Sequence, residues 1–245
     1  MLDFGPETFG ELNAEGYDFF HDPGTTEISV ERIAEVAGSG KILELAIGTG
    51  RIALPLLQKG FDVAGIEGSP LMVEKLREKP GGDKIDVVIG DFADVNIDGI
   101  YDHVCLVFNT LFNLPSQDAQ LRCFANSAKR LKLGGTFLVE TFVPDISAFT
   151  NHQRVSTRHL DRSSVVIEAV VHDPVLQTFE FQRIQFTENG TRLVPLPMRY
   201  AYPPELDLMA KLAGLRLRDR WGGWNKEPFT SDSKMHVSVY EKAAA

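Results

Sequence analysis

The chain lacks the features that several classes of protein require. Its 245 residues include two cysteines, Cys105 and Cys123, which lie in apolar stretches and form no C-x-x-C pair. We expect buried, reduced thiols rather than a disulfide framework or a metal site. No apolar run approaches the ~18 residues of a membrane helix. The acidic N-terminus also lacks the basic start and apolar segment of a signal peptide. These absences predict a cytoplasmic protein without membrane contact.

Basic residues are scarce as well. The chain has 25 Lys and Arg against 34 Asp and Glu, for a net charge of −9. A protein that wraps nucleic acid needs clustered cations to neutralise phosphates. The nearest approach to a cluster, 215–220, is typical of the solvent side of a strand. The six histidines show no spacing of metal ligands. We therefore expect neither a nucleic-acid partner nor a metal.

What the chain does have, up to Pro144, is an alternation of strand-like and helix-like segments. Strands are predicted at 41–46, 62–66, 84–92, 102–108 and 136–142, and helices at 27–37, 51–58, 70–78 and 118–131. Such alternation indicates a parallel sheet covered on both faces.

The alternation stops after Pro144. Three consecutive strands, at 165–172, 176–187 and 192–202, are joined by turns at Asp173-Pro174 and Asn189-Gly190, which predicts an antiparallel meander. A helix at 205–213 and a strand pair at 215–221 and 235–241 follow.

A glycine turn connects the first strand to a helix. The stretch KILELAIGTGRIALPLL contains Gly48, Gly50 and Ala53 in G-x-G-x-x-A spacing, which fits a dinucleotide and a methyl donor equally well. Ligands of open α/β sheets bind at the carboxyl ends of the strands, so the residues there discriminate between the two. Glu44 precedes the turn. Its carboxylate would repel a pyrophosphate but suits the ammonium group of an amino acid.

Acidic residues also follow the next two strands. Glu67 ends the second strand, where a carboxylate can accept both hydroxyls of a ribose. Asp91, in the G-D-F of Gly90–Phe92, can accept from an adenine amino group. Together these positions describe a ligand with amino-acid, ribose and adenine parts and no phosphate.

In this order the motifs resemble those of the class I S-adenosylmethionine-dependent methyltransferases. The resemblance covers 41–142 and extends to LKLGGTFLVE at the fifth strand and to the terminal helix and strand pair. It implies an α/β fold with a Rossmann-like, seven-stranded, mostly parallel sheet, a reversed C-terminal hairpin, and an antiparallel β meander inserted after strand five. It also implies S-adenosylmethionine as cofactor and S-adenosylhomocysteine as product. One departure is Ala46, where many members have Gly.

The resemblance further implies a single methyltransferase domain over 1–245. Its core would be 24–144 and 203–245, with an N-terminal lid segment at 1–23 and an inserted lid sheet at 145–202. The meander is similar to the lid sheets of small-molecule methyltransferases, including the amino-sugar and glycine N-methyltransferase groups. Because long edge strands are an aggregation hazard, we expect the meander to contribute to a homodimer.

Residues that match the family's donor-binding positions are then candidates for this role. They are Tyr17, Glu44, Ala46, Gly48, Gly50, Glu67, Gly68, Met72, Asp91, Phe92 and Phe108. For Met72 and Phe92 core packing is an equal alternative. Tyr17 can instead be a packed surface aromatic.

Polar and aromatic residues after strands four and five are candidates for the chemistry and the acceptor. Asn109 and Glu140 are the catalytic candidates, with a turn cap and a structural ion pair as their alternatives. Acceptor-binding candidates are Phe112, Asn113, Arg199, Tyr200, Tyr202, Trp221 and Trp224, for all of which ordinary packing is the alternative. His21 and His236 are possible bases, although a lone histidine is more often structural.

We therefore predict transfer of a methyl group to nitrogen or oxygen of a small, partly apolar molecule. The alternative is a non-methylating enzyme or regulator that binds S-adenosylmethionine on the same fold. A nicotinamide oxidoreductase is disfavoured because the chain lacks a Tyr-x-x-x-Lys motif after the turn.

Overall fold

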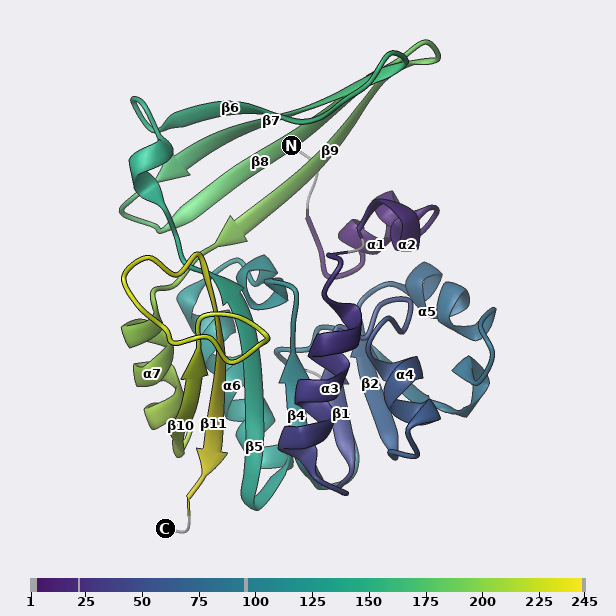
Figure 1. The fold of residues 1–245 in the computed structure, drawn as a ribbon, viewed down its shortest axis with the longest axis vertical. Coiled ribbons are helices and arrows are strands. Elements are labelled where there is room, and N and C mark those ends of the chain that lie inside the picture. Colours follow the sequence, from purple (N-terminus) through teal and green to yellow (C-terminus); the bar gives the residue numbers. More distant parts are fainter. Residues whose placement is uncertain (1–3, 22, 95–96, 244–245) are drawn as a thin grey trace.

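The structure is a computed structural model that describes residues 4–21, 23–94 and 97–243 (Figure 1). Its larger sheet has strands Ile42–Leu45 (β1), Val63–Glu67 (β2), Asp86–Ile89 (β3), Tyr101–Leu106 (β4), Leu131–Phe142 (β5), Leu215–Trp221 (β10) and Met235–Lys242 (β11). Their order is β10-β11-β5-β4-β1-β2-β3. The first five strands are mutually parallel, and β11 runs antiparallel to both β5 and β10. The predicted seven-stranded sheet with a reversed hairpin is confirmed.

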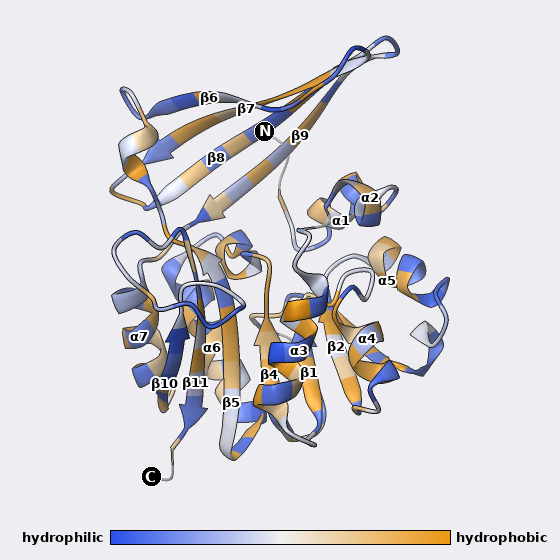
Figure 2. Ribbon diagram, viewed as in Figure 1, coloured by the Kyte–Doolittle hydropathy of each residue, from blue (hydrophilic) through white to orange (hydrophobic). Residues whose placement is uncertain are grey.

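Helices cover both faces of this sheet (Figure 1). They are Thr26–Ala37 (α3), Ala53–Gln58 (α4), Pro70–Arg77 (α5), Gln117–Arg130 (α6) and Pro203–Leu212 (α7). Alternate residues of a strand point to opposite faces. Accordingly, Val104 and Leu106 of β4 pack with α6 and α7, whereas Cys105 packs with α3 and α4. Because β1, β2, β4 and the part of β5 after Gly134 are buried on both sides, they are among the most continuously apolar parts of the chain (Figure 2).

The segment after β5 forms a separate antiparallel sheet of four strands. They are Gln153–Leu160 (β6), Ser164–Asp173 (β7), Thr178–Thr187 (β8) and Gly190–Arg199 (β9), in the order β6-β7-β8-β9. This small sheet lies beyond the carboxyl ends of the parallel strands (Figure 1). A short 3₁₀ helix, Ile146–Ala148 (η3), leads into it.

Four elements differ most from the sequence-based expectation. Strand β6 was missed because its sequence, QRVSTRHL, is mostly polar and largely exposed. Strand β5 begins at Leu131 rather than 136, since Leu131 pairs with Tyr101 and a register irregularity follows. The N-terminal segment contains two short helices, Thr8–Asn13 (α1) and Tyr17–Phe20 (α2), which the sequence did not indicate.

Three further expectations concern the cysteines, membrane-spanning helices and self-association. Both cysteines are buried and unpaired, as predicted. Among the described residues, no helix is long and apolar enough to cross a bilayer. Val155 and Leu160 are exposed on the edge strand β6, at 71% and 73%. Self-association of the small sheet stays a prediction.

A buried neutral histidine makes the fold sensitive to acid. His103 on β4 is fully buried, its Nδ1 lies 2.7 Å from Thr136 Oγ1, and burial lowers its pKa to about 3. Between that value and about 6.5, the unfolded chain binds a proton that the folded chain does not. The unfolded state is therefore favoured as pH falls through this range.

We predict that His103→Gln reduces the pH dependence of stability. The slope of unfolding free energy against pH between 4 and 6 should fall by about 1.4 kcal/mol per pH unit. Urea unfolding at several pH values measures this slope, and the exposed His159 on β6 supplies the control His159→Gln. An unchanged slope in His103→Gln would contradict the assignment.

Candidate active site

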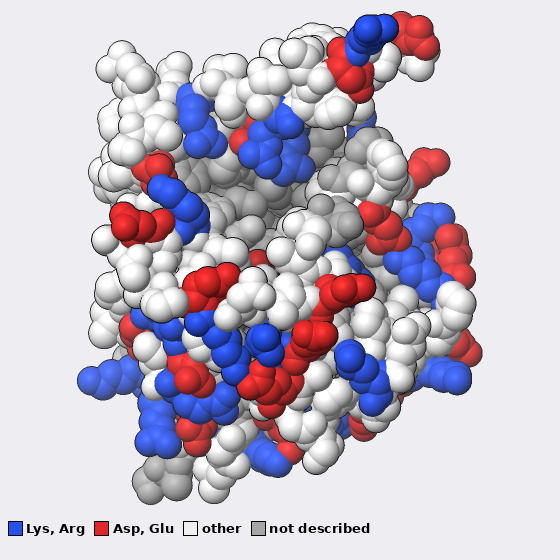
Figure 3. All heavy atoms as spheres, in the orientation of Figure 1, with Lys and Arg blue, Asp and Glu red and all other residues white. Residues whose placement is uncertain are grey.

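A cavity of ≈ 350 Å³ lies at the carboxyl ends of the parallel strands, within the usual size range of ligand sites. The described residues that line it are Phe4, Gly5, Pro6, Phe9, Gly10, Tyr17 and His21 from the N-terminal segment, Ala46, Gly48, Glu67, Gly68, Met72, Gly90, Asp91, Phe92, Phe108, Asn109, Thr110, Asn113, Leu114 and Pro115 from the strand ends, and Arg158, Arg183, Leu196 and Met198 from the small sheet. Figure 3 shows the molecule hollowed below the small sheet, with Lys and Arg side chains on the rim.

The glycine turn after β1 supplies one wall of the cavity. Ala46, Gly48 and Gly50 all have positive φ, of 53°, 58° and 84°. A Cβ on Gly48 would meet only Ala46 O, at 4.0 Å, so this position opens into space. A Cβ on Gly50 would come within 2.3 Å of Leu76 Cδ1. Gly50 is therefore required for packing against α5 and, contrary to expectation, is not among the described residues that line the cavity.

Position 46 is an alanine where glycine is commoner, and this residue has an unfavourable backbone conformation. Its φ of 53° lies in the left-handed region, where a Cβ is unfavourable and glycine is not. Ala46 lines the cavity despite this cost.

Glu67 connects two of the turns. Its Oε2 accepts from Gly48 N at 2.8 Å and its Oε1 accepts from Ser69 N at 2.9 Å. Burial raises its pKa, although these backbone donors act in the opposite direction. A carboxylate has room for about four hydrogen bonds, so Glu67 can still accept hydroxyl groups from a ligand in the cavity.

Glu44 differs from Glu67 although both belong to parallel strands. Glu44 is opposite Gly65, two residues before Glu67, and is only 3% exposed. It is not among the described residues that line the cavity, so its expected role toward the donor stays a prediction. Burial raises its pKa to about 8, and its Oε2 is without a hydrogen-bond partner among the described residues.

The N-terminal segment covers the cavity with a cluster of rings. Tyr17 stacks on His21 with ring centroids 4.7 Å apart, and Phe9 meets both rings edge-on. Burial raises the pKa of Tyr17 to about 12. Burial and the Arg183 guanidinium lower the pKa of His21. These rings are uncharged at neutral pH and present an apolar surface.

Polar contacts attach the N-terminal segment to the region of the glycine turn and to the small sheet. Asp18 contacts Lys79 Nζ at 2.6 Å and Thr49 Oγ1 at 2.5 Å, next to the glycine turn. Arg183 Nη1 lies 3.2 Å from His21 Nε2 and joins the segment to the small sheet. The cavity is therefore enclosed by three parts of the chain that contact one another.

After β4 the backbone turns through two left-handed residues that face the cavity. Phe108 and Asn109 have φ of 62° and 63°. Glu140 Oε2 accepts from Phe108 N at 2.7 Å, and Asn109 Oδ1 accepts from Phe142 N at 2.6 Å. Burial raises the pKa of Glu140, while the Phe108 N–H and the Trp224 side chain act in the opposite direction. Glu140 is not among the described residues that line the cavity, so the geometry favours a positioning role over the expected catalytic one.

Known proteins that resemble this chain include methyltransferases. Residues 42–135 match the family model described as a methyltransferase domain. The structure of the CcbJ methyltransferase from Streptomyces caelestis is 37% identical, covers 98% of this chain and 100% of its own, and has a TM-score of 0.92. The cypemycin N-terminal methyltransferase of Streptomyces sp is 25% identical over 97% of this chain and 98% of its own length. An S-adenosylmethionine-dependent methyltransferase from Clostridium acetobutylicum, 14% identical with a TM-score of 0.79 over 94% of this chain and 98% of its own, shares the fold.

The chain belongs to the class I S-adenosylmethionine-dependent methyltransferases.

The residues of this methyltransferase fit the donor. Gly48 opens into the cavity, and Glu44 presents an unpartnered buried oxygen below the turn. Further donor candidates that line the cavity are Tyr17, Ala46, Glu67, Gly68, Met72, Asp91, Phe92 and Phe108. The structure thus brings together the expected donor residues except Glu44 and Gly50.

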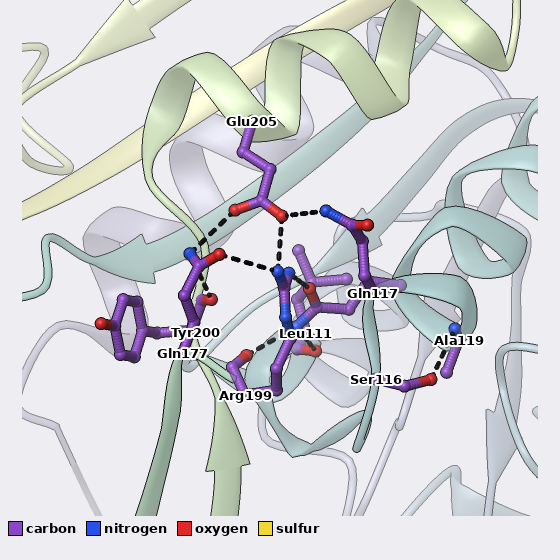
Figure 4. A network of polar contacts seen from close by, with 9 residues as sticks. Leu111, Ser116, Gln117, Ala119, Gln177, Arg199, Tyr200 and Glu205 are labelled. Carbon is purple, nitrogen blue, oxygen red and sulfur yellow. Dashed lines mark hydrogen bonds and ion pairs between the residues drawn. The ribbon is translucent and has the colours of Figure 1, made fainter. Parts of the chain in front are cut away.

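The expected acceptor residues of the methyltransferase are largely elsewhere. Arg199 ends β9 and donates to Gln120 Oε1, Gln177 Oε1 and Glu205 Oε1 at 2.6, 3.1 and 2.6 Å. Gln117 and Gln177 also donate to Glu205 (Figure 4). This network joins the small sheet to α6 and α7. Arg199 is therefore a structural connector, not part of the cavity wall.

The aromatic candidates for acceptor binding are not among the described residues that line the cavity. Tyr200 is buried, bonds His172 through its hydroxyl at 2.9 Å and stacks on Phe179. The other aromatic candidates pack into the two core clusters: Phe112 and Tyr202 in one, Trp221 and Trp224 in the other. Asn113 is the acceptor candidate that does line the cavity.

His236, the second possible base, is buried away from the cavity. Its ring nitrogens lie 2.9 Å from Thr141 Oγ1 and 2.8 Å from Ser238 Oγ, and burial lowers its pKa to about 3. His21 does line the cavity.

Several lining residues were missed by the sequence analysis. Arg158 lies on the unpredicted strand β6, and Arg183 on β8 carried no motif. Leu196 and Met198 of β9 also line the cavity, and only the antiparallel pairing of the sheet reveals them.

Glu67→Ala tests the donor site. Loss of the carboxylate removes a charged hydrogen-bond acceptor, so we expect S-adenosylhomocysteine to bind more weakly by about 1–3 kcal/mol. Calorimetry measures the affinity, with Glu31→Ala on the exposed face of α3 as control. A folded Glu67→Ala protein with wild-type affinity would remove Glu67 from the donor site.

Glu140→Gln tests the positioning role. An amide carries no charge and keeps only one oxygen where the carboxylate has two, so the hydrogen bond from Phe108 N is weakened or lost. We expect the free energy of unfolding to fall by about 1–3 kcal/mol. Urea unfolding measures the loss, with the exposed Glu180→Gln on β8 as control. Wild-type stability in Glu140→Gln would argue against this role.

Proposed function

We propose that this enzyme methylates the nitrogen of a small, partly apolar amine, with a hydroxyl oxygen as the alternative target. The observation that carries the proposal is the placement of Asn113. It lines the same cavity as the donor candidates, and its Oδ1 is buried without a partner among the described residues. A buried carbonyl oxygen in this state suits an N–H donor on a ligand.

The surroundings of Asn113 support an acceptor of limited size. The cavity is walled by rings at Phe9, Tyr17, Phe92 and Phe108 and is covered by the small sheet. An enclosed apolar wall with few polar groups suits a small molecule better than a polymer. The net charge of −9 also disfavours nucleic acid.

The names of two relatives favour nitrogen as the target atom. The cypemycin N-terminal methyltransferase acts, by its name, on an N-terminus. The KedS8 sugar N-methyltransferase from Streptoalloteichus sp shares the fold at 16% identity, with a TM-score of 0.65 over 91% of this chain and 90% of its own. Nitrogen is therefore the favoured target.

Methyl transfer requires little chemistry from the side chains of the protein. The donor supplies an electrophilic methyl group. The protein holds the amine in line and excludes water. We assign orientation of the amine to Asn113, and closure over the donor to Tyr17 and Phe9 of the N-terminal segment. An amine that arrives uncharged needs no dedicated base.

A transfer assay tests the proposal. Purified enzyme is incubated with methyl-labelled S-adenosylmethionine and a panel of small primary and secondary amines, matched alcohols, RNA, DNA and folded protein. We expect label in amines, and about tenfold lower turnover in Asn113→Ala with unchanged affinity for S-adenosylhomocysteine, because the variant loses one hydrogen bond to the acceptor.

The control is Asn189→Ala at the exposed turn between β8 and β9. Efficient labelling of RNA, DNA or folded protein would overturn the small-molecule assignment. Labelling confined to alcohols would reassign the target atom to oxygen.

A further inference from the structure

The small sheet carries a cluster of three arginines around one carboxylate. Glu168 on β7 is 4% exposed. Its carboxylate lies 3.6 Å from Arg154, 3.8 Å from Arg158 and 3.5 Å from Arg183. Arg154 and Arg158 come from β6, and Arg183 is the cross-strand partner of Glu168 on β8. Three guanidinium groups share one negative charge, so the cluster carries a net charge of +2.

Two of these arginines line the cavity. They are Arg158 and Arg183, beside Leu196 and Met198 of the same sheet. The described acidic residues of the cavity wall are Glu67, at the end of β2, and Asp91, in the loop after β3, rather than residues of the small sheet. The cavity therefore has its acidic groups at the strand ends and its excess of positive charge on the side of the small sheet.

This excess of positive charge is unusual for the chain, and Glu168 neutralises only part of it. The protein as a whole has a net charge of −9, so the cluster opposes its average sign. The contacts to Glu168 are 3.5 to 3.8 Å, longer than the charge-assisted hydrogen bonds of about 2.7–2.9 Å. Arg183 contacts Glu168 through Nε and His21 through Nη1. A guanidinium has five N–H donors, so donors remain for a ligand.

We propose that Arg158 and Arg183 bind an oxyanion of the acceptor, a carboxylate or a phosphate group. The acceptor is then an amine that also carries an acid group, and the acid end docks on the small sheet while the amine lies near Asn113. This inference rests on the proposed function and names its substrate class. Arginine suits the role because its planar fork of donors matches such anions.

Matched probes test the inference by binding alone. They are N-benzylglycine, its neutral carboxamide and its phosphonate analogue, titrated by calorimetry into enzyme saturated with S-adenosylhomocysteine. We expect at least one acid probe to bind tenfold or more tighter than the carboxamide. A preference for the carboxylate or for the phosphonate identifies which anion the acceptor carries.

Single substitutions identify the binding groups. Arg158→Gln and Arg183→Gln should each reduce the preference for the acid probe to threefold or less. Arg162→Gln, at the exposed turn between β6 and β7, should leave it unchanged. A preference that persists in both cavity variants would overturn the inference.

Glu168→Gln separates binding from a structural role by the sign of its effect. Removing the competing carboxylate should tighten binding of the acid probe at least threefold, because both guanidiniums are released to the ligand. Weaker or unchanged binding would mean that the arginines serve only to hold the sheet together, and would overturn the inference.

The outcomes also distinguish this inference from the function on which it rests. Wild-type enzyme that does not bind S-adenosylhomocysteine would contradict the proposed function. Wild-type enzyme that binds it but takes the acid and neutral probes equally well would contradict only the arginine site.

Discussion

The donor site depends on one buried carboxylate that accepts hydrogen bonds from two different turns. Glu67 ends β2 and bonds the backbone of Gly48, after β1, and of Ser69, before α5. Buried N–H groups need partners, and a carboxylate supplies strong ones. The two turns are thereby held in a fixed relation before any ligand arrives. A site assembled in advance loses less entropy on binding than one that must be ordered by its ligand.

The core of the fold was predictable from sequence because its strands are buried on both faces. Strands such as β4, with Val104 and Cys105 packing on opposite sides, produce apolar runs that are easy to recognise. The donor-side residues were predictable because they follow these strands directly. Glu44 shows the limit of this reasoning. Its register opposite Gly65 places it two residues deeper than Glu67, and a single sequence contains no information on register.

The acceptor side was less predictable for two physical reasons. Aromatic residues near the end of β9, such as Tyr200, suggested a pocket wall but pack where the small sheet meets the larger one. Arg158 belongs to a strand whose polar sequence shows little alternation, and Arg183 reaches the cavity only because the small sheet lies over the ends of the parallel strands. The placement of the small sheet and the contacts of a buried charge such as Arg199 with Glu205 are set by tertiary packing, which the sequence pattern does not indicate.

The small sheet enters and leaves the rest of the molecule at one place. The ring of Phe179 lies 6.4 Å from that of Phe142, where the chain enters the sheet, and 4.7 Å from that of Tyr200, where the chain leaves it. An insertion whose ends lie close together costs its host little loop-closure entropy. Such an insertion can therefore vary at little entropic cost to the larger sheet. Cavity residues of the small sheet, such as Arg158 and Arg183, can then change while the residues at the strand ends stay the same.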